Sequence, residues 1–247
     1  MTIAIIKAGR TYDHMKVRYG DFEDWIMAGL GLENKQVWII NVTNGEPLPD
    51  LSLLSGIVIT GSHDSVLDDL PWKASTSAWI REAVICRIPL LGICFGHQLL
   101  AHAMGGEVAD NPKGSEFGSV RLTILIAAEK DRLFQGIGDC QVNVSHWQSV
   151  TVLPKNAVLL AHSEMESHQA FCIDDIAWGV QFHPEFNQYV TKDYILSKLD
   201  YFKSQGINIA KMKTACKESA IGSLILQRFL KLTTQPAVVE IADGSPN

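Results

Sequence analysis

The stretch Pro89-Leu-Leu-Gly-Ile-Cys94-Phe-Gly-His-Gln-Leu-Leu-Ala101 decides the fold of this chain. Its first half is an apolar run typical of a strand, its second half has helical spacing, and a glycine stands two positions to either side of Cys94. A strand that turns sharply into a helix needs such glycines, because side chains there would collide with neighbouring backbone. The pattern predicts a strained, exposed cysteine at the carboxyl edge of a sheet, where the helix amino end favours its thiolate.

Apolar runs alternate with helical patterns through the first half of the chain. We expect strands at 3–6, 36–42, 56–60 and 88–93, and helices at 22–30 and 72–87. This alternation is typical of a parallel sheet with helices on both faces. Further strands, without long helices between them, are expected at 119–125, 141–144, 157–162, 169–173 and 177–182. The prediction is therefore an α/β fold with an open, mostly parallel twisted sheet and an antiparallel or mixed extension.

Two further helices are expected after the sheet. One spans 190–204, and a second spans 210–232 with Ile221, Leu224, Ile225 and Phe229 along one stripe. Such a stripe usually covers its own domain, although docking of a partner is the alternative. The stretch 233–247 is expected to be loose. We thus divide the chain into a core domain at 1–204 and a helical extension with a loose tail at 205–247.

Composition excludes several classes of protein. The chain has 247 residues, of which 47% are hydrophobic, and its net charge is −6 with no basic block. A folded core is therefore expected, and a nucleic-acid partner is disfavoured. The apolar run at 3–6 ends at Lys7 without the features of a signal peptide, and no apolar stretch approaches the roughly 20 residues that cross a bilayer. We expect a soluble, cytoplasmic protein with no membrane partner.

The five cysteines have no pairing pattern. An odd number without any Cys-x-x-Cys argues against a disulfide framework and against a structural zinc site. His97 and His102 are five apart, which does not match a helical metal pair, and no Gly-x-x-x-x-Gly-Lys phosphate loop is present. No metal and no organic cofactor are expected, and Cys94 is the thiol predicted to react.

A cysteine nucleophile needs a base, and the stretch Trp178-Gly-Val-Gln-Phe-His183-Pro-Glu185 offers one. In extended geometry His183 and Glu185 leave the chain on the same side, so Glu185 is placed to hold the ring while His183 accepts the thiol proton. His-Pro-Glu alone would be a surface turn, but the upstream cysteine favours a catalytic triad. A third loop follows the strand at 56–60, and the N–H groups of Gly61 and Phe95 are candidate donors to a developing oxyanion.

The motifs Gly-Ile-Cys-Phe-Gly-His-Gln and, about ninety residues later, Gln-Phe-His-Pro-Glu together resemble the class I (triad) glutamine amidotransferases. The resemblance covers roughly residues 3 to 200, is closest to stand-alone members similar to the glutaminase domain of GMP synthase, and implies their flavodoxin-like fold. It implies that Cys94, His183 and Glu185 form the triad and that the backbone of Gly61 and Phe95 forms the oxyanion hole. It also implies substrate contacts from Gln98, Ser145, His146, Trp147 and Gln148.

Two segments depart from the family pattern. The oxyanion turn reads Gly61-Ser62-His63 where the family often has Gly-Pro-Gly or Gly-Ser-Pro. His146-Trp147-Gln148 stands where members similar to GMP synthase read His-Gly-Asp. A tryptophan beside the substrate either narrows the pocket or offers a stacking surface, so the nature of the substrate's tail stays open.

The resemblance implies hydrolysis of glutamine through a γ-glutamyl thioester on Cys94, with release of glutamate and ammonia. Three functions remain open. The chain is a glutaminase that supplies ammonia to a separate synthase or acceptor subunit, a stand-alone γ-glutamyl hydrolase or peptidase acting on peptides such as glutathione, or a non-catalytic regulatory module. The intact set of triad residues counts against the third function.

Overall fold

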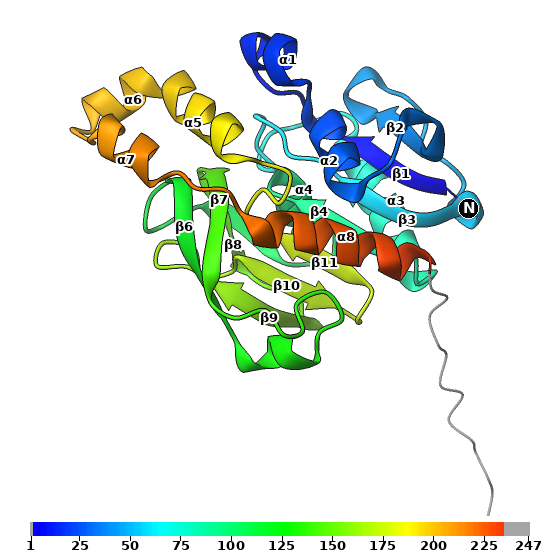
Figure 1. Ribbon diagram of the computed structural model, residues 1–247. Coiled ribbons are helices and arrows are strands. Elements are labelled where there is room, and N and C mark those ends of the chain that lie inside the picture. Colours follow the sequence, from blue (N-terminus) through cyan, green and yellow to red (C-terminus); the bar gives the residue numbers. More distant parts are fainter. Residues whose placement is uncertain (1, 235–247) are drawn as a thin grey trace, which may run out of the picture.

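A nine-stranded sheet runs through the centre of the computed structural model, which describes residues 2–234 (Figure 1). Its strand order is β2-β1-β3-β4-β11-β10-β9-β6-β7, and β5 pairs with β8 in a separate two-stranded sheet. The strands are β1 (Thr2–Lys7), β2 (Val37–Asn41), β3 (Leu54–Ile59), β4 (Leu90–Ile93), β5 (Glu107–Asp110), β6 (Glu116–Ile124), β7 (Cys140–His146), β8 (Gln148–Val152), β9 (Ala157–His162), β10 (Ala170–Ile173) and β11 (Ala177–Val180).

The pairing of the strands confirms the predicted fold class. β2, β1, β3, β4 and β11 run parallel, and β10, β9, β6 and β7 extend the sheet in antiparallel fashion. Parallel strands come mainly from the half of the sequence where strands and helices alternate, because each crossover needs a helix-length connection. The small β5–β8 sheet was not predicted, since β5 has only four residues and β8 follows β7 almost directly.

Helices cover both faces of the sheet, as predicted. They are α1 (Asp13–Tyr19), α2 (Phe22–Leu30), α3 (Lys73–Ile85), α4 (Phe95–Ala103), α5 (Gln188–Ser197), α6 (Leu199–Ser204), α7 (Ile209–Ala215) and α8 (Ala220–Thr234). Alternate residues of β1 point to opposite faces. Ile3 and Ile5 pack in the core cluster that includes α2 and α8, whereas Ala4 and Ile6 pack in the cluster that includes α3 and α4. The first of these clusters also holds the apolar side of the antiparallel extension.

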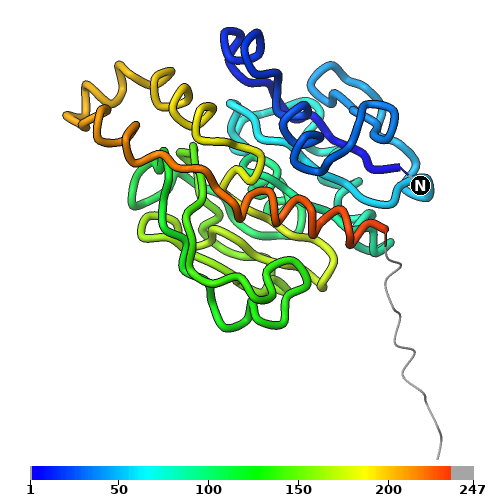
Figure 2. The backbone as a smooth tube through the Cα atoms, in the orientation of Figure 1, coloured from blue at the N-terminus to red at the C-terminus, as the bar shows by residue number. Residues whose placement is uncertain are grey.

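The last helix, α8, is part of the core. It crosses the molecule between the N-terminal half of the chain and the antiparallel strands (Figure 2) and contacts α2, β3 and β7. Ile225 and Phe229 of the predicted stripe are fully buried, and Ile221 and Leu224 pack against the same cluster. The predicted stripe therefore covers the chain's own domain.

The predicted helix boundaries after residue 189 were wrong. The helix expected at 190–204 is divided into α5 and α6 at Lys198, whose φ of −111° leaves the helical region. The helix expected at 210–232 is divided into α7 and α8, because Cys216 is extended and the Ser219 hydroxyl accepts the N–H of Gly222 in the manner of a helix cap. α8 continues to Thr234, so the first two residues of the expected loose tail are helical, and 235–247 lie outside the described residues.

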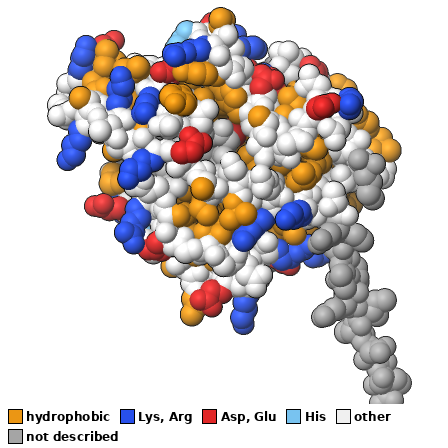
Figure 3. Space-filling model, in the orientation of Figure 1, with side chains coloured by type: hydrophobic (Ala, Val, Ile, Leu, Met, Phe, Trp, Pro, Cys, Tyr) orange, Lys and Arg blue, Asp and Glu red, His pale blue; other side chains and the backbone are white. Residues whose placement is uncertain are grey.

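One face of the molecule mixes both signs of charge. On the face shown in Figure 3, Lys and Arg side chains lie among acidic and apolar ones. Within residues 2–234, no helix combines the length and the apolar character that crossing a bilayer would require.

Candidate active site

The site lies at the carboxyl edge of the parallel strands, where ligands bind in open α/β sheets. β4 and β11 are neighbours, with Ile93 opposite Val180, and the N–H of Cys94 donates to the Val180 carbonyl at 2.9 Å. The loop after β4, which carries Cys94, therefore leaves the sheet beside the loop after β11, which carries His183. Gly61 follows β3, on the other side of β4.

Cys94 occupies a strained turn between β4 and α4. Its φ of 51° and ψ of −101° are unusual for a residue other than glycine, which confirms the predicted strain. The predicted exposure was wrong, because the side chain is buried. A Cβ at Gly92 would lie 2.6 Å from the carbonyl carbon of Gly96, and a Cβ at Gly96 would lie 2.5 Å from the carbonyl oxygen of Ile59. Both glycines are thus required by close backbone packing, for the steric reason inferred from the sequence.

His183 and Glu185 meet across a turn. Their Nδ1 and Oε1 atoms are 2.7 Å apart, both side chains are buried, and the ring of Phe186 stacks on His183 at 3.9 Å. The extended geometry expected here was wrong, because β11 ends at Val180 and the N–H of Phe186 bonds the His183 carbonyl at 3.3 Å. Burial opposes the charge on His183, yet the Glu185 carboxylate and the Cys94 thiol together raise its pKa to about 10.

The two candidate oxyanion donors border the same space. Gly61 is buried beneath His183, and a Cβ added to it would lie 3.1 Å from His183 Cε1. The Thr60 hydroxyl fixes this turn by donating to the Gly61 carbonyl at 2.9 Å and accepting the N–H of Ala8 at 3.0 Å. Phe95 is the first residue of α4, and the first N–H groups of a helix lack intrahelical partners.

The segment from Ser145 to Gln148 is held mainly through its backbone. Gln98 Nε2 donates to the Gln148 carbonyl at 3.0 Å and to Gln181 Oε1 at 2.9 Å. The His146 ring points inward, with Nε2 3.1 Å from Glu116 and Nδ1 3.0 Å from the Gln148 carbonyl. The Ser145 carbonyl lies 3.9 Å from the Cys94 sulfur, while the Trp147 side chain remains 36% exposed. The segment therefore presents backbone groups and one indole ring to the site.

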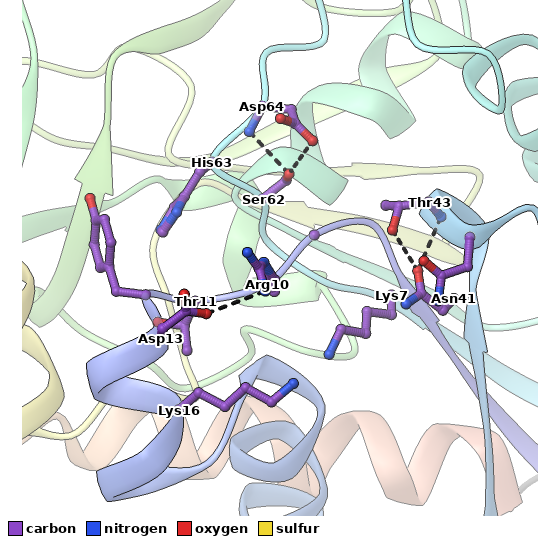
Figure 4. Close-up of a pocket in the computed structure, with 13 residues that line it drawn as sticks. Lys7, Arg10, Thr11, Asp13, Lys16, Asn41, Thr43, Ser62, His63 and Asp64 are labelled. Atoms are coloured by element: carbon purple, nitrogen blue, oxygen red, sulfur yellow. Dashed lines mark hydrogen bonds and ion pairs between the residues drawn. The ribbon is translucent and has the colours of Figure 1, made fainter.

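These residues enclose a small cavity of about 50 Å³ that reaches Cys94. One group of lining residues is Gln98 with 145–148, and the other comprises Tyr12, Ser62, His63, Asp64, Tyr194 and Lys198. Tyr12 and the 62–64 turn also line a larger neighbouring cleft of about 630 Å³. In Figure 4, Ser62, His63 and Asp64 border this cleft on one side and Lys7, Arg10 and Lys16 on the other. The Cys94 cavity thus adjoins a much larger space.

Several residues that line the cavity were not predicted. Tyr12, Tyr194 and Lys198 reach the cavity from distant positions, and the Tyr194 hydroxyl bonds Thr11 at 2.8 Å and His63 at 3.3 Å. Loss of solvent beneath these rings, with the nearby charge of Lys198, lowers the pKa of His63. No local motif marks such residues, because long-range packing brings them to the site.

Three of the other thiols and the buried His97 differ from this arrangement. Burial raises the pKa of Cys140 to about 11 and raises the pKa values of Cys172 and Cys216 as well. His97 lies fully buried against Phe171, and burial lowers its pKa to about 3. These pKa shifts favour the uncharged form of each group at neutral pH, in keeping with the prediction that Cys94 is the thiol that reacts.

Comparison with known proteins identifies the family. A model of the family described as glutamine amidotransferase class-I matches residues 19–199. The chain belongs to the class I glutamine amidotransferases. It is 34% identical to Gamma-glutamyl peptidase 4 of Arabidopsis thaliana over 73% of this chain and 74% of that protein. Gamma-glutamyl peptidase 3 of the same plant is 28% identical over 89% and 92%. GMP synthase of Bacteroides fragilis is 33% identical over 53% of this chain, but over only 25% of its own length.

Solved structures agree with this family membership. A glutamine amidotransferase from Methylobacillus flagellatus superimposes with a TM-score of 0.69 at 27% identity, covering 94% of each chain. One from Thermotoga maritima, at 20% identity, has a TM-score of 0.76 over 95% of this chain and 99% of that chain, and it shows the shared fold. This family member therefore has the α/β sheet of its relatives together with the C-terminal helices described above.

Proposed function

We propose that this amidotransferase homologue hydrolyses the γ-amide bond of a γ-glutamyl substrate, with Cys94 as nucleophile, His183 as base and acid, and Glu185 as the partner of His183. One observation carries the proposal. The strained Cys94 begins α4 directly beside the turn that holds His183 2.7 Å from Glu185. A thiol, a base and a carboxylate that orients the base are the groups that nucleophilic catalysis requires. Family membership adds independent support.

The proposed reaction has two halves. The Cys94 thiolate attacks the γ-carbonyl carbon, and the amides of Gly61 and Phe95 donate to the oxyanion. The carbonyl then re-forms as the C–N bond breaks, and His183 passes a proton to the departing nitrogen, which leaves as ammonia or an amine. A γ-glutamyl thioester remains on Cys94. His183 next takes a proton from water, the resulting hydroxide attacks the thioester, and cleavage of the C–S bond releases glutamate.

The raised pKa of His183 fits the start of this cycle. A thiolate paired with an imidazolium is the reactive form of a cysteine nucleophile, and the negative groups beside His183 favour the imidazolium. Gln98 and the backbone of 145–148 are assigned to the α-amino and α-carboxylate groups of the substrate. The contact from Gln98 to the Gln148 carbonyl would hold that backbone in place.

Two substrate classes suit this chemistry. The adjoining cleft of about 630 Å³ is far larger than ammonia requires, which favours a γ-glutamyl peptide whose leaving group extends from the cavity. Two relatives that cover most of the chain are named as γ-glutamyl peptidases, which also favours this class. The alternative is hydrolysis of glutamine with ammonia passing to a separate synthase subunit. This alternative is favoured by the similarity between the chain and GMP synthase, which extends over one quarter of the length of that enzyme.

The test compares wild type with Cys94→Ala on glutamine and on glutathione. Cysteinylglycine released from glutathione supports the peptidase, and ammonia released from glutamine supports the glutaminase. Cys94→Ala should abolish both activities, and intact-mass measurement of quenched wild type should show the γ-glutamyl adduct. A wild type that turns over neither substrate, even with a candidate synthase present, and that forms no adduct would refute the proposed chemistry.

A further inference from the structure

Lys198 has an unusual position at the cavity that reaches Cys94. It follows α5 directly, where the helix's C-terminal end favours a positive charge, and its side chain is half-buried among the lining residues. Its Nζ lies 5.7 Å from the ring centre of Tyr12 and 5.7 Å from that of Trp147. These rings belong to the two different groups of residues that line the cavity. The ammonium group is thus held between them at the opening to the site.

The hydrogen-bonding capacity of Lys198 is unused by the protein. Within residues 2–234, its Nζ has neither an ion pair within 4.0 Å nor a hydrogen bond, whereas Lys7 pairs with Asp21 at 2.7 Å. Asp64 also lines the cavity, but its carboxylate accepts the Ser62 hydroxyl at 3.2 Å. Contact with aromatic faces steadies a cation without consuming its N–H donors. Lys198 therefore has three donors for a ligand.

We propose that Lys198 binds a carboxylate of the substrate and selects anionic γ-glutamyl compounds. This inference rests on the proposed function and adds a specificity-determining residue to it. An ammonium that is partly shielded from water and has no protein anion is suited to a charge-assisted hydrogen bond with a carboxylate. The carboxylate assigned to Lys198 is the terminal one of the leaving peptide, because Gln98 and the backbone of 145–148 are assigned to the α-carboxylate of the glutamyl residue. Glutamine carries only that α-carboxylate.

Binding is measured first, so that chemistry is not required. Calorimetry measures the affinity of three proteins, all carrying Cys94→Ala: one with Lys198, one with Lys198→Met and one with Lys198→Arg. The ligands are glutathione, its glycyl monoethyl ester, its α-carboxyl ester and glutamine. Lys198→Met should weaken glutathione binding about 10- to 30-fold, the loss expected for a partly exposed charged hydrogen bond, and Lys198→Arg should retain most of the affinity. Lys192→Met is the matched control, because Lys192 lies on α5 over Tyr189 and does not line the cavity.

The esters identify the carboxylate. If the effect of Lys198→Met disappears with the glycyl ester, Lys198 binds the carboxylate of the leaving peptide, as proposed. If it disappears with the α-ester and persists with glutamine, Lys198 binds the α-carboxylate that all these substrates share, and the proposed selection is overturned. Equal losses for every ligand, or no loss at all, overturn the inference, as does an equal effect of Lys192→Met.

Kinetics of the same substitution in the otherwise wild-type enzyme should show a raised KM with kcat unchanged. The two proposals can fail separately. If wild type turns over no substrate but Lys198→Met still weakens binding of glutathione more than binding of its glycyl ester, the proposed function is overturned and this inference stands. If wild type turns over the substrate but Lys198→Met weakens binding of both ligands equally, the proposed function stands and this inference is overturned.

Discussion

The close approach of α8 to the turn between His183 and Glu185 makes Gly222→Ala an informative substitution. Gly222 lies in the first turn of α8 and packs on Pro184, the residue between the proposed base and its carboxylate partner. A Cβ at this position would lie 3.0 Å from the carbonyl carbon of Pro184 and 3.1 Å from its Cα, and closer still to its carbonyl oxygen. All three atoms belong to backbone, so no side-chain rotation relieves the overlap.

The size of the effect follows from these distances. Ordinary contacts begin at 3.4 Å, so relief of the carbonyl carbon alone requires a shift of 3.4 − 3.0 = 0.4 Å. The carbonyl oxygen lies closer still, so the Pro184 backbone must move by more than 0.4 Å or α8 must retreat from the core. A misplacement of about 1 Å at a catalytic group costs on the order of 100-fold in rate. We therefore expect kcat to fall by about 10- to 100-fold, with KM little changed. Overpacking of this kind also costs about 1 to 3 kcal/mol of the free energy of unfolding.

Gly29→Ala provides a matched control. Its Cβ would overlap Cδ1 of Leu226, which is the end of a flexible side chain and not part of the turn that carries Pro184. Both glycines are helical, so the intrinsic gain from alanine, about 1 kcal/mol, is common to the two variants. Gly29→Ala should lower Tm without lowering kcat.

The assay is steady-state kinetics on the substrate that wild type turns over, together with thermal unfolding of each variant. Ser223→Ala, a change on the exposed side of α8, should match wild type in both measurements. The reasoning is refuted if Gly222→Ala retains the wild-type kcat, or if Gly29→Ala lowers kcat to the same extent.

Three further predictions concern buried polar groups. Asp131→Ala removes the acceptor of the N–H groups of Leu133 and Phe134 and of the Trp178 indole, all at 2.9 Å. Chemical denaturation should show a loss of at least about 2 kcal/mol in the free energy of unfolding, and an unchanged midpoint would contradict this role. Glu116→Ala removes the carboxylate that binds His146, Gln169 and Ser163, so we expect the 145–148 segment to loosen and the KM to rise. A fall in kcat with an unchanged KM would contradict this role of Glu116. Because the pKa of His183 rises from an ordinary 6.5 to about 10 on folding, its contribution to stability is complete below pH 6.5 and is lost as pH rises toward 10. The Tm advantage of wild type over His183→Asn should therefore shrink across that window, and a constant difference would show that the imidazolium is not favoured.

Much of the fold was predictable because its signals are local. Apolar runs separated by helical spacing identified the parallel strands, and the two glycines around Cys94 predicted a turn whose backbone contacts leave no room for side chains. The helices after residue 189 were predicted less well, since an interruption such as the one at Cys216 depends on contacts with distant residues. The N–H of Lys217, for example, bonds the hydroxyl of Ser119.

The residues of the candidate site also differ in how well the sequence predicts them. Cys94, His183 and Glu185 stand in short motifs that a reader of the sequence can recognise. Lys198 and Tyr12 stand in no motif, and they line the Cys94 cavity only because α5 and the loop after β1 pack against each other. The hydrogen bond between Thr11 and Tyr194 is part of that contact. The residues proposed to react are thus easier to predict than those proposed to select the substrate.

The turn that carries His183 and Glu185 shows how a loop becomes rigid without regular secondary structure. On one side His183 Cε1 lies against Gly61, and on the other the Pro184 backbone lies against Gly222 of α8. The His183 N–H also donates to the Asn143 carbonyl at 2.8 Å, while the Asn143 side chain donates to the Phe186 carbonyl at 3.0 Å. A side chain at Gly222 would displace the turn, so the 2.7 Å contact between His183 and Glu185 depends on α8 as well as on the strand before it.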